Sequence, residues 1–226
     1  SRTGTKRCVL WIRNLRMTRK MNIIYGEEKE DSEEAEEQPS SPFGMSDEEE
    51  PLLGLIGEIT ESAAQQIALM LLTFNGGGIL RPKSPEEKEE DIEFFISTPG
   101  GSLSEMFTIY DLMELVKRRR DIATFGYGKI ASAGVPLLAS GTKGKRYIAK
   151  NARLMMHHCS SNVSGPHPNV RANYNELKTV EDMMVKILVE HTNLSAGEIY
   201  NIFSKNTDEY FSAEEALEMG IVDKII

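Results

Sequence analysis

A serine surrounded by small residues is the first candidate for chemistry in this sequence. Ser132 lies in the stretch GKIASAG, residues 128–134, between a strand-like run and an apolar stretch. A serine hydroxyl becomes a nucleophile when a neighbouring imidazole takes its proton, and small neighbours would leave this hydroxyl accessible. A serine at the start of a helix is also a common N-cap. The stretch alone leaves both roles, nucleophile and helix cap, open for Ser132.

The partners that a nucleophilic serine needs are a base and a carboxylate. His157 and His158 end the apolar stretch ARLMMHH, where a histidine is also common as a core residue with satisfied hydrogen bonds. Because neighbouring residues of a strand point to opposite faces, only one of the two can meet Ser132. Asp208, in KNTDEYFSA, reads on its own as a turn residue before a helix. These residue types permit a serine–histidine–aspartate site without establishing one.

The elements that must position these residues alternate between short apolar strands and amphipathic helices from Pro51 onward. This alternation predicts right-handed βαβ crossovers, a largely parallel sheet and the α/β class. Thr60 is the expected cap of the first helix, and Ser212 and Glu215 form an expected capping box. Strands are expected at 52–59, 92–97, 122–128, 145–149 and 152–158, and helices at 63–74, 103–115, 132–141, 169–191 and 212–220.

The charge distribution sets the first 50 residues apart from the rest. Residues 1–20 contain basic but no acidic side chains, whereas residues 27–50 are strongly acidic. Like-charged blocks with few apolar residues bury too little surface to offset chain entropy, so 1–50 is predicted to be a mostly disordered tail or a propeptide. The folded domain is expected at 51–226, interrupted at 75–91 by an exposed loop rich in glycine, proline and charge.

The composition argues against several classes of function. The net charge of −9 argues against a nucleic-acid partner, since phosphate binding needs clustered lysines and arginines. No apolar run approaches the ~18–20 residues that span a bilayer, so no membrane association is expected. The two cysteines, Cys8 and Cys159, do not form a disulfide framework, which favours a reducing compartment.

Four stretches of the folded part resemble ClpP, the proteolytic subunit of the Clp protease. They are STPGGSLSEMFTIYDLM, GKIASAG, GTKGKRYIAKNARLMMHH and DEYFSAEEALEMGIVDKI, in the same order as in the family. The resemblance covers residues 52–226 and implies a crotonase-like α/β fold of repeated βαβ units with a projecting long helix. It also implies a serine endopeptidase that uses neither a cofactor nor a metal ion.

The resemblance assigns the catalytic roles residue by residue. It implies that Ser132 is the nucleophile and that His157, rather than His158, is the general base. Asp208 corresponds to the carboxylate that orients the base. Ser132 is then expected to be both the nucleophile and the cap of the following helix.

The resemblance also indicates where a substrate peptide binds. The backbone N–H groups of Gly101 and Ala133 correspond to the oxyanion hole, in which one donor commonly contributes about 10²–10³ in rate. An extended peptide would add as a strand between two segments of the chain through main-chain hydrogen bonds. These segments are Gly101–Leu103, which contains Ser102 and Leu103, and residues 159–162, which begin with Cys159 and Ser160.

The partners that the resemblance implies are copies of the chain, an unfoldase and its substrates. Family members form heptameric rings that stack in pairs, and the 169–191 helix corresponds to the element that joins the rings. An AAA+ unfoldase uses ATP to deliver unfolded polypeptides and docks at a surface to which Phe95 and Leu115 correspond. The protein is therefore expected in the cytoplasm, or in the matrix or stroma of an organelle.

The sequence departs from the family at positions that bear on assembly and docking. The usual HQP reads HHC at residues 157–159, and Thr207 replaces an arginine that commonly forms ion pairs between rings. Glu93 stands where an aromatic residue is common, and the 75–91 loop is an insertion near the docking side. Two alternatives to an active peptidase stay open: a non-catalytic ClpR-like ring subunit, which typically lacks triad residues, and an enoyl-CoA hydratase-type relative.

Overall fold

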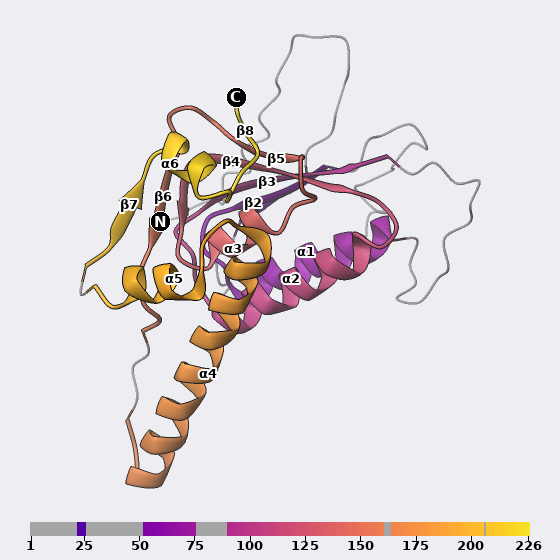
Figure 1. The fold of residues 1–226 in the computed structure, drawn as a ribbon. Coiled ribbons are helices and arrows are strands. Elements are labelled where there is room, and N and C mark those ends of the chain that lie inside the picture. Colours follow the sequence, from indigo (N-terminus) through magenta and orange to yellow (C-terminus); the bar gives the residue numbers. More distant parts are fainter. Residues whose placement is uncertain (1–21, 26–51, 76–89, 161–163, 206) are drawn as a thin grey trace, which may run out of the picture.

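The computed structural model describes residues 22–25, 52–75, 90–160, 164–205 and 207–226, arranged as Figure 1 shows. Within these residues an eight-stranded sheet forms the centre of the molecule. The predicted α/β class and largely parallel sheet are confirmed. Three helices cover one face of the sheet: α1 (Glu61–Phe74), α2 (Leu103–Val116) and α3 (Gly134–Ala139).

The strands of the described chain form one main path and one branch. Along the path they run parallel in the order β1 (Asn22–Tyr25), β2 (Leu52–Ile56), β3 (Ile92–Thr98), β4 (Ile122–Ala131), β5 (Arg146–Ile148) and β8 (Lys224–Ile225). The branch consists of β6 (Arg153–Met156), parallel to β4, and β7 (Glu209–Phe211), antiparallel to β6. The branch places β6 beside the end of β4 and β7, from the C-terminal part of the chain, on the other side of β6.

Strand β4 changes partner halfway along its length. Its residues Thr124–Gly126 pair with β5, whereas Lys129–Ala131 pair with β6. Gly128 lies between the two pairings with a φ of +61°, in the left-handed region that glycine adopts at little steric cost. The pairing with β3 also shifts register between Ile96 and Thr98. This irregular stretch separates the β5 pairing from the β6 pairing, so Ala131 at the end of β4 lies beside β6.

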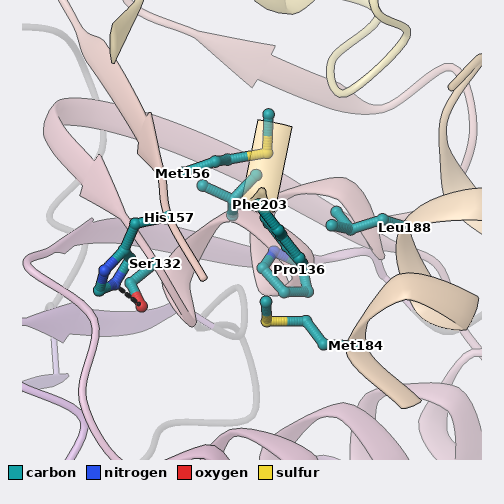
Figure 2. A pocket seen from close by; sticks show the side chains of 8 residues that line it. Ser132, Pro136, Met156, His157, Met184, Leu188 and Phe203 are labelled. Carbon is teal, nitrogen blue, oxygen red and sulfur yellow. Dashed lines mark hydrogen bonds between the residues drawn. The ribbon is translucent and has the colours of Figure 1, made fainter. Parts of the chain in front are cut away.

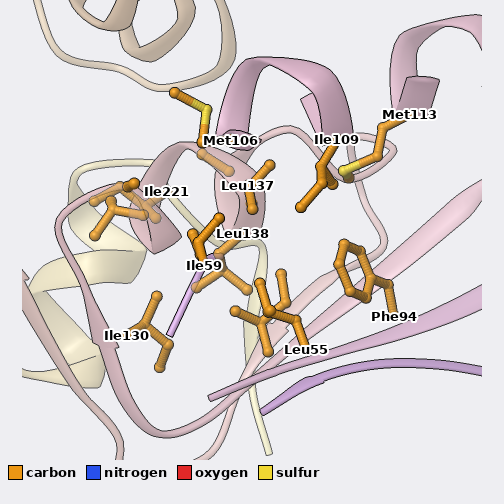
Figure 3. Close-up of a cluster of buried hydrophobic side chains, with 14 of the residues drawn as sticks. Leu55, Ile59, Phe94, Met106, Ile109, Met113, Ile130, Leu137, Leu138 and Ile221 are labelled. Atoms are coloured by element: carbon orange, nitrogen blue, oxygen red, sulfur yellow. The ribbon is translucent and has the colours of Figure 1, made fainter. Parts of the chain in front are cut away.

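The hydrophobic core lies between the sheet and the helices that cover it. Buried and half-buried residues alternate along β3, so Phe94 points into the core and Phe95 lies on the opposite face. Figure 3 shows Phe94 near Ile109 and Met113 of α2, and all three side chains are fully buried. The predicted cap of α1 is confirmed, because the Thr60 side chain accepts a hydrogen bond from Ala63 N–H.

Helix α4 (His167–His191) projects away from the sheet. Every residue of α4 from His167 to Glu176 is exposed, and its buried residues all lie in the half that returns to the core. These buried residues are Met184, Val185, Ile187 and Leu188. The helix is therefore attached to the domain by one end, as expected for the 169–191 segment.

Two short helices follow α4. The sequence reading missed α5 (Ala196–Phe203), although Ser195 and Glu198 form the capping box that signals its start. The capping box predicted for the last helix is confirmed: Ser212 and Glu215 bond reciprocally at the start of α6 (Ala213–Glu218). Gly220 follows the C-cap residue with a φ of +69°, as a glycine that ends a helix commonly does.

The predicted tail contributes one strand to the described structure. Asn22–Tyr25 forms β1 and pairs with β2 at the edge of the sheet, whereas the rest of 1–50 lies outside the described residues. Residues 76–89 of the predicted 75–91 loop also lie outside them. Among the helices of the described ranges, none has the length and apolar character needed to cross a bilayer.

The alternation in β3 makes a stability prediction for two adjacent phenylalanines. Phe94→Ala should reduce the free energy of unfolding by about 3–5 kcal/mol, because it leaves a cavity in the core. Phe95→Ala should cost less than half as much, because that side chain is only half-buried and lies in a row of stacked rings outside the core. Urea unfolding of both variants measures the difference, and equal losses would contradict the assignment of the two faces.

Candidate active site

Ser132 lies between the end of β4 and the start of α3 with an unusual backbone conformation. Its φ is +53°, and among the residues that the structure describes it is the one non-glycine residue with a positive φ. Left-handed backbone costs a residue with a Cβ roughly 1–2 kcal/mol, so it persists only where the surroundings hold it. Ser132 N–H donates to Met155 O at 2.8 Å, and Ser132 O accepts from Val135 N–H at 3.0 Å.

The expectation that Ser132 caps the following helix is wrong. The N-cap of α3 is Ala133, and no side chain makes a capping hydrogen bond there. The left-handed turn directs the Ser132 side chain toward His157, and its hydroxyl lies 2.8 Å from His157 Nε2. The hydroxyl is therefore part of a side-chain pair and not of the helix start.

His157 follows directly after β6, and Figure 2 shows its ring next to Ser132. The parallel pairing of Ala131 with Met155 sets the two strands in register, so the residue after β4 lies close to the residue after β6. When Nδ1 carries the imidazole proton, Ser132 O–H donates to Nε2. His158 is exposed, so the structure places the first of the two histidines, and not the second, against the serine.

Asp208 lies near the far side of the same imidazole. Its Oδ1 is 3.9 Å from His157 Nδ1, beyond hydrogen-bonding distance, and its side chain is 48% exposed. Its other oxygen lies 3.5 Å from the hydroxyl of Tyr210. The antiparallel pairing of Met156 with Glu209 brings Asp208 to this position. A shift of about 1 Å would bring the carboxylate and imidazole into hydrogen-bonding contact.

The glycine turn after β3 packs directly against Ser132. A Cβ on Gly100 would lie 2.7 Å from Ser132 Cβ and 3.3 Å from Ala133 N, so this close approach requires glycine. Ile59 N–H donates to Gly100 O, and Ser102 N–H donates to Ile59 O. These two bonds use the groups that flank Gly101 and leave Gly101 N–H directed to the other side. The structure thus brings the Gly101 and Ala133 segments to the same place as the serine.

An apolar recess lies beside the Ser132–His157 pair (Figure 2). Its side chains leave no room for a water molecule between them. Apart from the pair itself, it is lined by Val135, Pro136, Met156, Met184, Leu188 and Phe203. The sequence did not predict this recess, since Phe203 belongs to helix α5, which was not expected.

The two expected peptide-binding segments differ in their structure. Gly101 forms an isolated bridge with Ile59, but Ser102 is the N-cap of α2 and Leu103 is the first residue of that helix. The segment is therefore extended only at Gly101, because the Ser102 side chain accepts a hydrogen bond from Glu105 N–H and starts a helix.

The second segment begins after His157 and lies against α4. Cys159 is half-buried and its N–H donates to Glu181 Oε2 at 3.0 Å, whereas Ser160 is exposed. Residues 161–163 lie outside the described residues. Burial, together with the neighbouring Glu181 carboxylate, raises the pKa of the Cys159 thiol to about 12. The thiol is therefore protonated at neutral pH and is not a competing nucleophile.

The two residues expected at the docking surface lie on different elements. Phe95 belongs to a row of stacked rings on the sheet face that α1 and α2 leave uncovered, with centroids 4.9 Å apart for Phe95–Phe125 and 4.8 Å apart for Phe125–Tyr147. Leu115 is half-buried on α2.

Thr207, where the resemblance implies an arginine, is part of a local polar cluster. Thr207 Oγ1 donates to Glu209 at 3.1 Å, and Lys205 Nζ lies 2.7 Å from the same carboxylate. The Lys205 ammonium is the main cause of a lowered pKa of Glu209. Within the described ranges, histidine, cysteine and acidic side chains do not gather into a group of three that could hold a metal ion.

The fold and the site together define a class: an α/β protein in which a serine hydroxyl contacts an imidazole beside a glycine turn. Comparison with known proteins narrows this class to one family. A family model described as Clp protease matches residues 49–226. The chain therefore belongs to the Clp protease family.

Curated relatives carry the same description. The "ATP-dependent Clp protease proteolytic subunit 2" of Bifidobacterium longum (strain NCC 2705) is 36% identical over 169 residues, which cover 75% of each chain. The protein of the same name from Thermobifida fusca (strain YX) is 36% identical over 143 residues, or 63% of this chain and 68% of the relative. The chain is thus similar to peptidase subunits over most of the part that folds into the described domain.

The close approach of Gly100 to Ser132 makes a prediction with a matched control. Gly100→Ala should destabilise the protein more than Gly144→Ala, by about 1–3 kcal/mol, because only the first adds a Cβ that collides with neighbouring atoms. The φ values of Gly100 and Gly144 are +95° and +90°, so backbone strain is similar in both variants. Chemical unfolding measures the two losses, and equal losses would show that the turn does not press on Ser132.

Proposed function

We propose that the protein is a catalytically active serine endopeptidase subunit of a Clp protease. The observation that carries the proposal is the 2.8 Å contact between Ser132 Oγ and His157 Nε2, made by a serine whose left-handed backbone keeps its hydroxyl out of the helix cap. Membership of the Clp protease family supports the reaction class. A non-catalytic ClpR-like role is less well supported, since Ser132, His157 and Asp208 are all present.

The proposed chemistry begins with proton transfer between the paired side chains. His157 Nε2 accepts the Ser132 proton while Oγ bonds to the substrate carbonyl carbon and the carbonyl electrons move to oxygen. Backbone N–H groups of Gly101 and Ala133 donate to that oxyanion. The imidazolium then gives its proton to the leaving amine, the C–N bond breaks, and an ester remains on Ser132. Water attacks the ester with His157 as its base, which releases the acid and restores the serine.

Asp208 is the proposed orienting carboxylate. Its Oδ1 lies 3.9 Å from Nδ1, on the side of the imidazole away from Ser132. Catalytic hydrogen bonds are often long without substrate and shorten in the reacting complex. We infer that Asp208 approaches Nδ1 when subunits assemble, because its exposed side chain has freedom to move.

The apolar recess suggests a preference for apolar substrate side chains next to the cleaved bond. Met156 and Met184 line it, and methionine side chains are flexible enough to move apart for a guest. Main-chain recognition at Gly101 and after His157 would add little sequence demand. This combination suits hydrolysis of unfolded polypeptides.

Assembly and delivery complete the proposal. Helix α4 extends exposed residues away from the domain, in a form suited to joining two heptameric rings. The Phe95 ring row offers an apolar surface for docking of an AAA+ unfoldase, and Leu115, half-buried on α2, is the second residue proposed for this contact. Location in the cytoplasm or in an organelle stays a prediction.

Labelling with a fluorophosphonate probe tests the active-peptidase proposal. The assembled wild-type protein should react at Ser132, and Ser132→Ala should lose the label and at least about 10³-fold of peptide hydrolysis, because the paired hydroxyl is the proposed nucleophile. Ser204→Ala is a suitable control, since that hydroxyl bonds to Asn201 O on α5. Assembled wild-type protein that stays unlabelled and inactive would favour the ClpR-like alternative.

A further inference from the structure

A hydrogen bond links the segment after His157 to the long helix. Glu181 lies on α4, and its Oε2 accepts from Cys159 N–H at 3.0 Å, with both residues half-buried. The donor is two residues beyond the imidazole that contacts Ser132. A hydrogen bond to an ionised carboxylate is stronger than one between neutral groups, which makes this contact a firm anchor.

The donor exists because of a departure from the family pattern. Where the related HQP motif has proline, this chain has Cys159, and proline has no N–H to donate. The chain thus combines a backbone donor at position 159 with an acceptor at position 181. The hydrogen bond requires both the Cys159 N–H and the Glu181 carboxylate.

The hydrogen bond acts on position 157 at the point where strand pairing has just ended. Strand β6 stops at Met156, and residues 157–160 have no regular secondary structure. The β4–β6 register therefore fixes His157 from one side, and the Glu181 bond fixes the chain on the other. Met184, three residues after Glu181 on α4, lines the recess beside Ser132 and His157. The same part of α4 thus makes two contacts with the site, the Glu181 hydrogen bond and the packing of Met184 in the recess.

We propose that Glu181 is a positioning residue, which holds residues 157–159 through Cys159 N–H so that His157 stays within reach of Ser132. The inference rests on the proposed peptidase function. It makes the placement of the imidazole depend on α4, the helix that extends away from the domain. The inference depends on the backbone N–H of Cys159; the thiol also lies beside the Glu181 carboxylate, and the Cys159→Ala background of the test removes its contribution.

A double-mutant cycle tests the pair. Cys159→Ala keeps the N–H and serves as the background, whereas Cys159→Pro removes the N–H. In the Cys159→Ala background, Glu181→Ala should lower kcat about 10-fold with little change in KM, because small displacements of a catalytic group mainly slow the chemical step. In the Cys159→Pro background, Glu181→Ala should have no further effect. Glu181→Gln should recover most of the loss, because its amide oxygen still accepts from the N–H.

The outcomes separate failure of this inference from failure of the proposed function. An active wild type in which Glu181→Ala leaves kcat unchanged, or in which both changes lower kcat independently, overturns the inference alone. Far-UV circular dichroism and particle size check that each variant folds and assembles. If Glu181→Ala does not assemble, the kcat of Cys159→Pro is compared with that of Cys159→Ala instead. If the wild type is inactive, the crystal structures of the two Cys159 variants decide. A longer Ser132 Oγ–His157 Nε2 distance in the proline variant supports the inference, and an unchanged distance overturns it.

Discussion

The register between β4 and β6 is the constraint on which the site depends. Ala131 pairs with Met155, and Ser132 N–H donates to Met155 O, so the last pair of the two strands places a serine and a histidine within reach. Side chains alternate along a strand, so a slip of one residue would turn the imidazole of His157 away from Ser132. The same N–H bond helps to hold the left-handed backbone of Ser132. The strand pairing therefore fixes both the position of the nucleophile and its direction.

The other parts of the site depend on this pair to different degrees. The Gly100 turn packs against Ser132 with no space for a side chain, so the expected oxyanion donors are fixed with the nucleophile. Asp208 directly precedes β7, a short strand at the edge of the branch, so the β6–β7 pairing positions it, and its carboxylate is half-exposed. The recess is closed by α4 and α5. The parts of the site next to the β4–β6 register are therefore fixed by strand pairing, whereas Asp208 and the recess depend on β7 and on the outer helices.

The sequence predicted what depends on local pattern and on family motifs. The α/β class, the cap at Thr60 and the Ser212–Glu215 box follow from spacing that reads the same in any context. Ser132 as a helix cap was wrong because its hydroxyl follows a left-handed turn that no local pattern reveals. The antiparallel direction of β7 and the Glu181–Cys159 bond could not be predicted, because both depend on where distant segments pack. Helix α5 could have been predicted, since the residues of its capping box, Ser195 and Glu198, have the typical spacing.

The crystal structure of the assembled protein after reaction with a fluorophosphonate tests the central claim most directly. The account predicts a covalent bond from Ser132 Oγ to phosphorus, with the phosphoryl oxygen accepting from Gly101 and Ala133 N–H groups. It also predicts that Asp208 lies within about 3 Å of His157 Nδ1. An adduct on another residue, or a phosphoryl oxygen directed away from both N–H groups, would contradict the claim that the β4–β6 register builds a peptidase site.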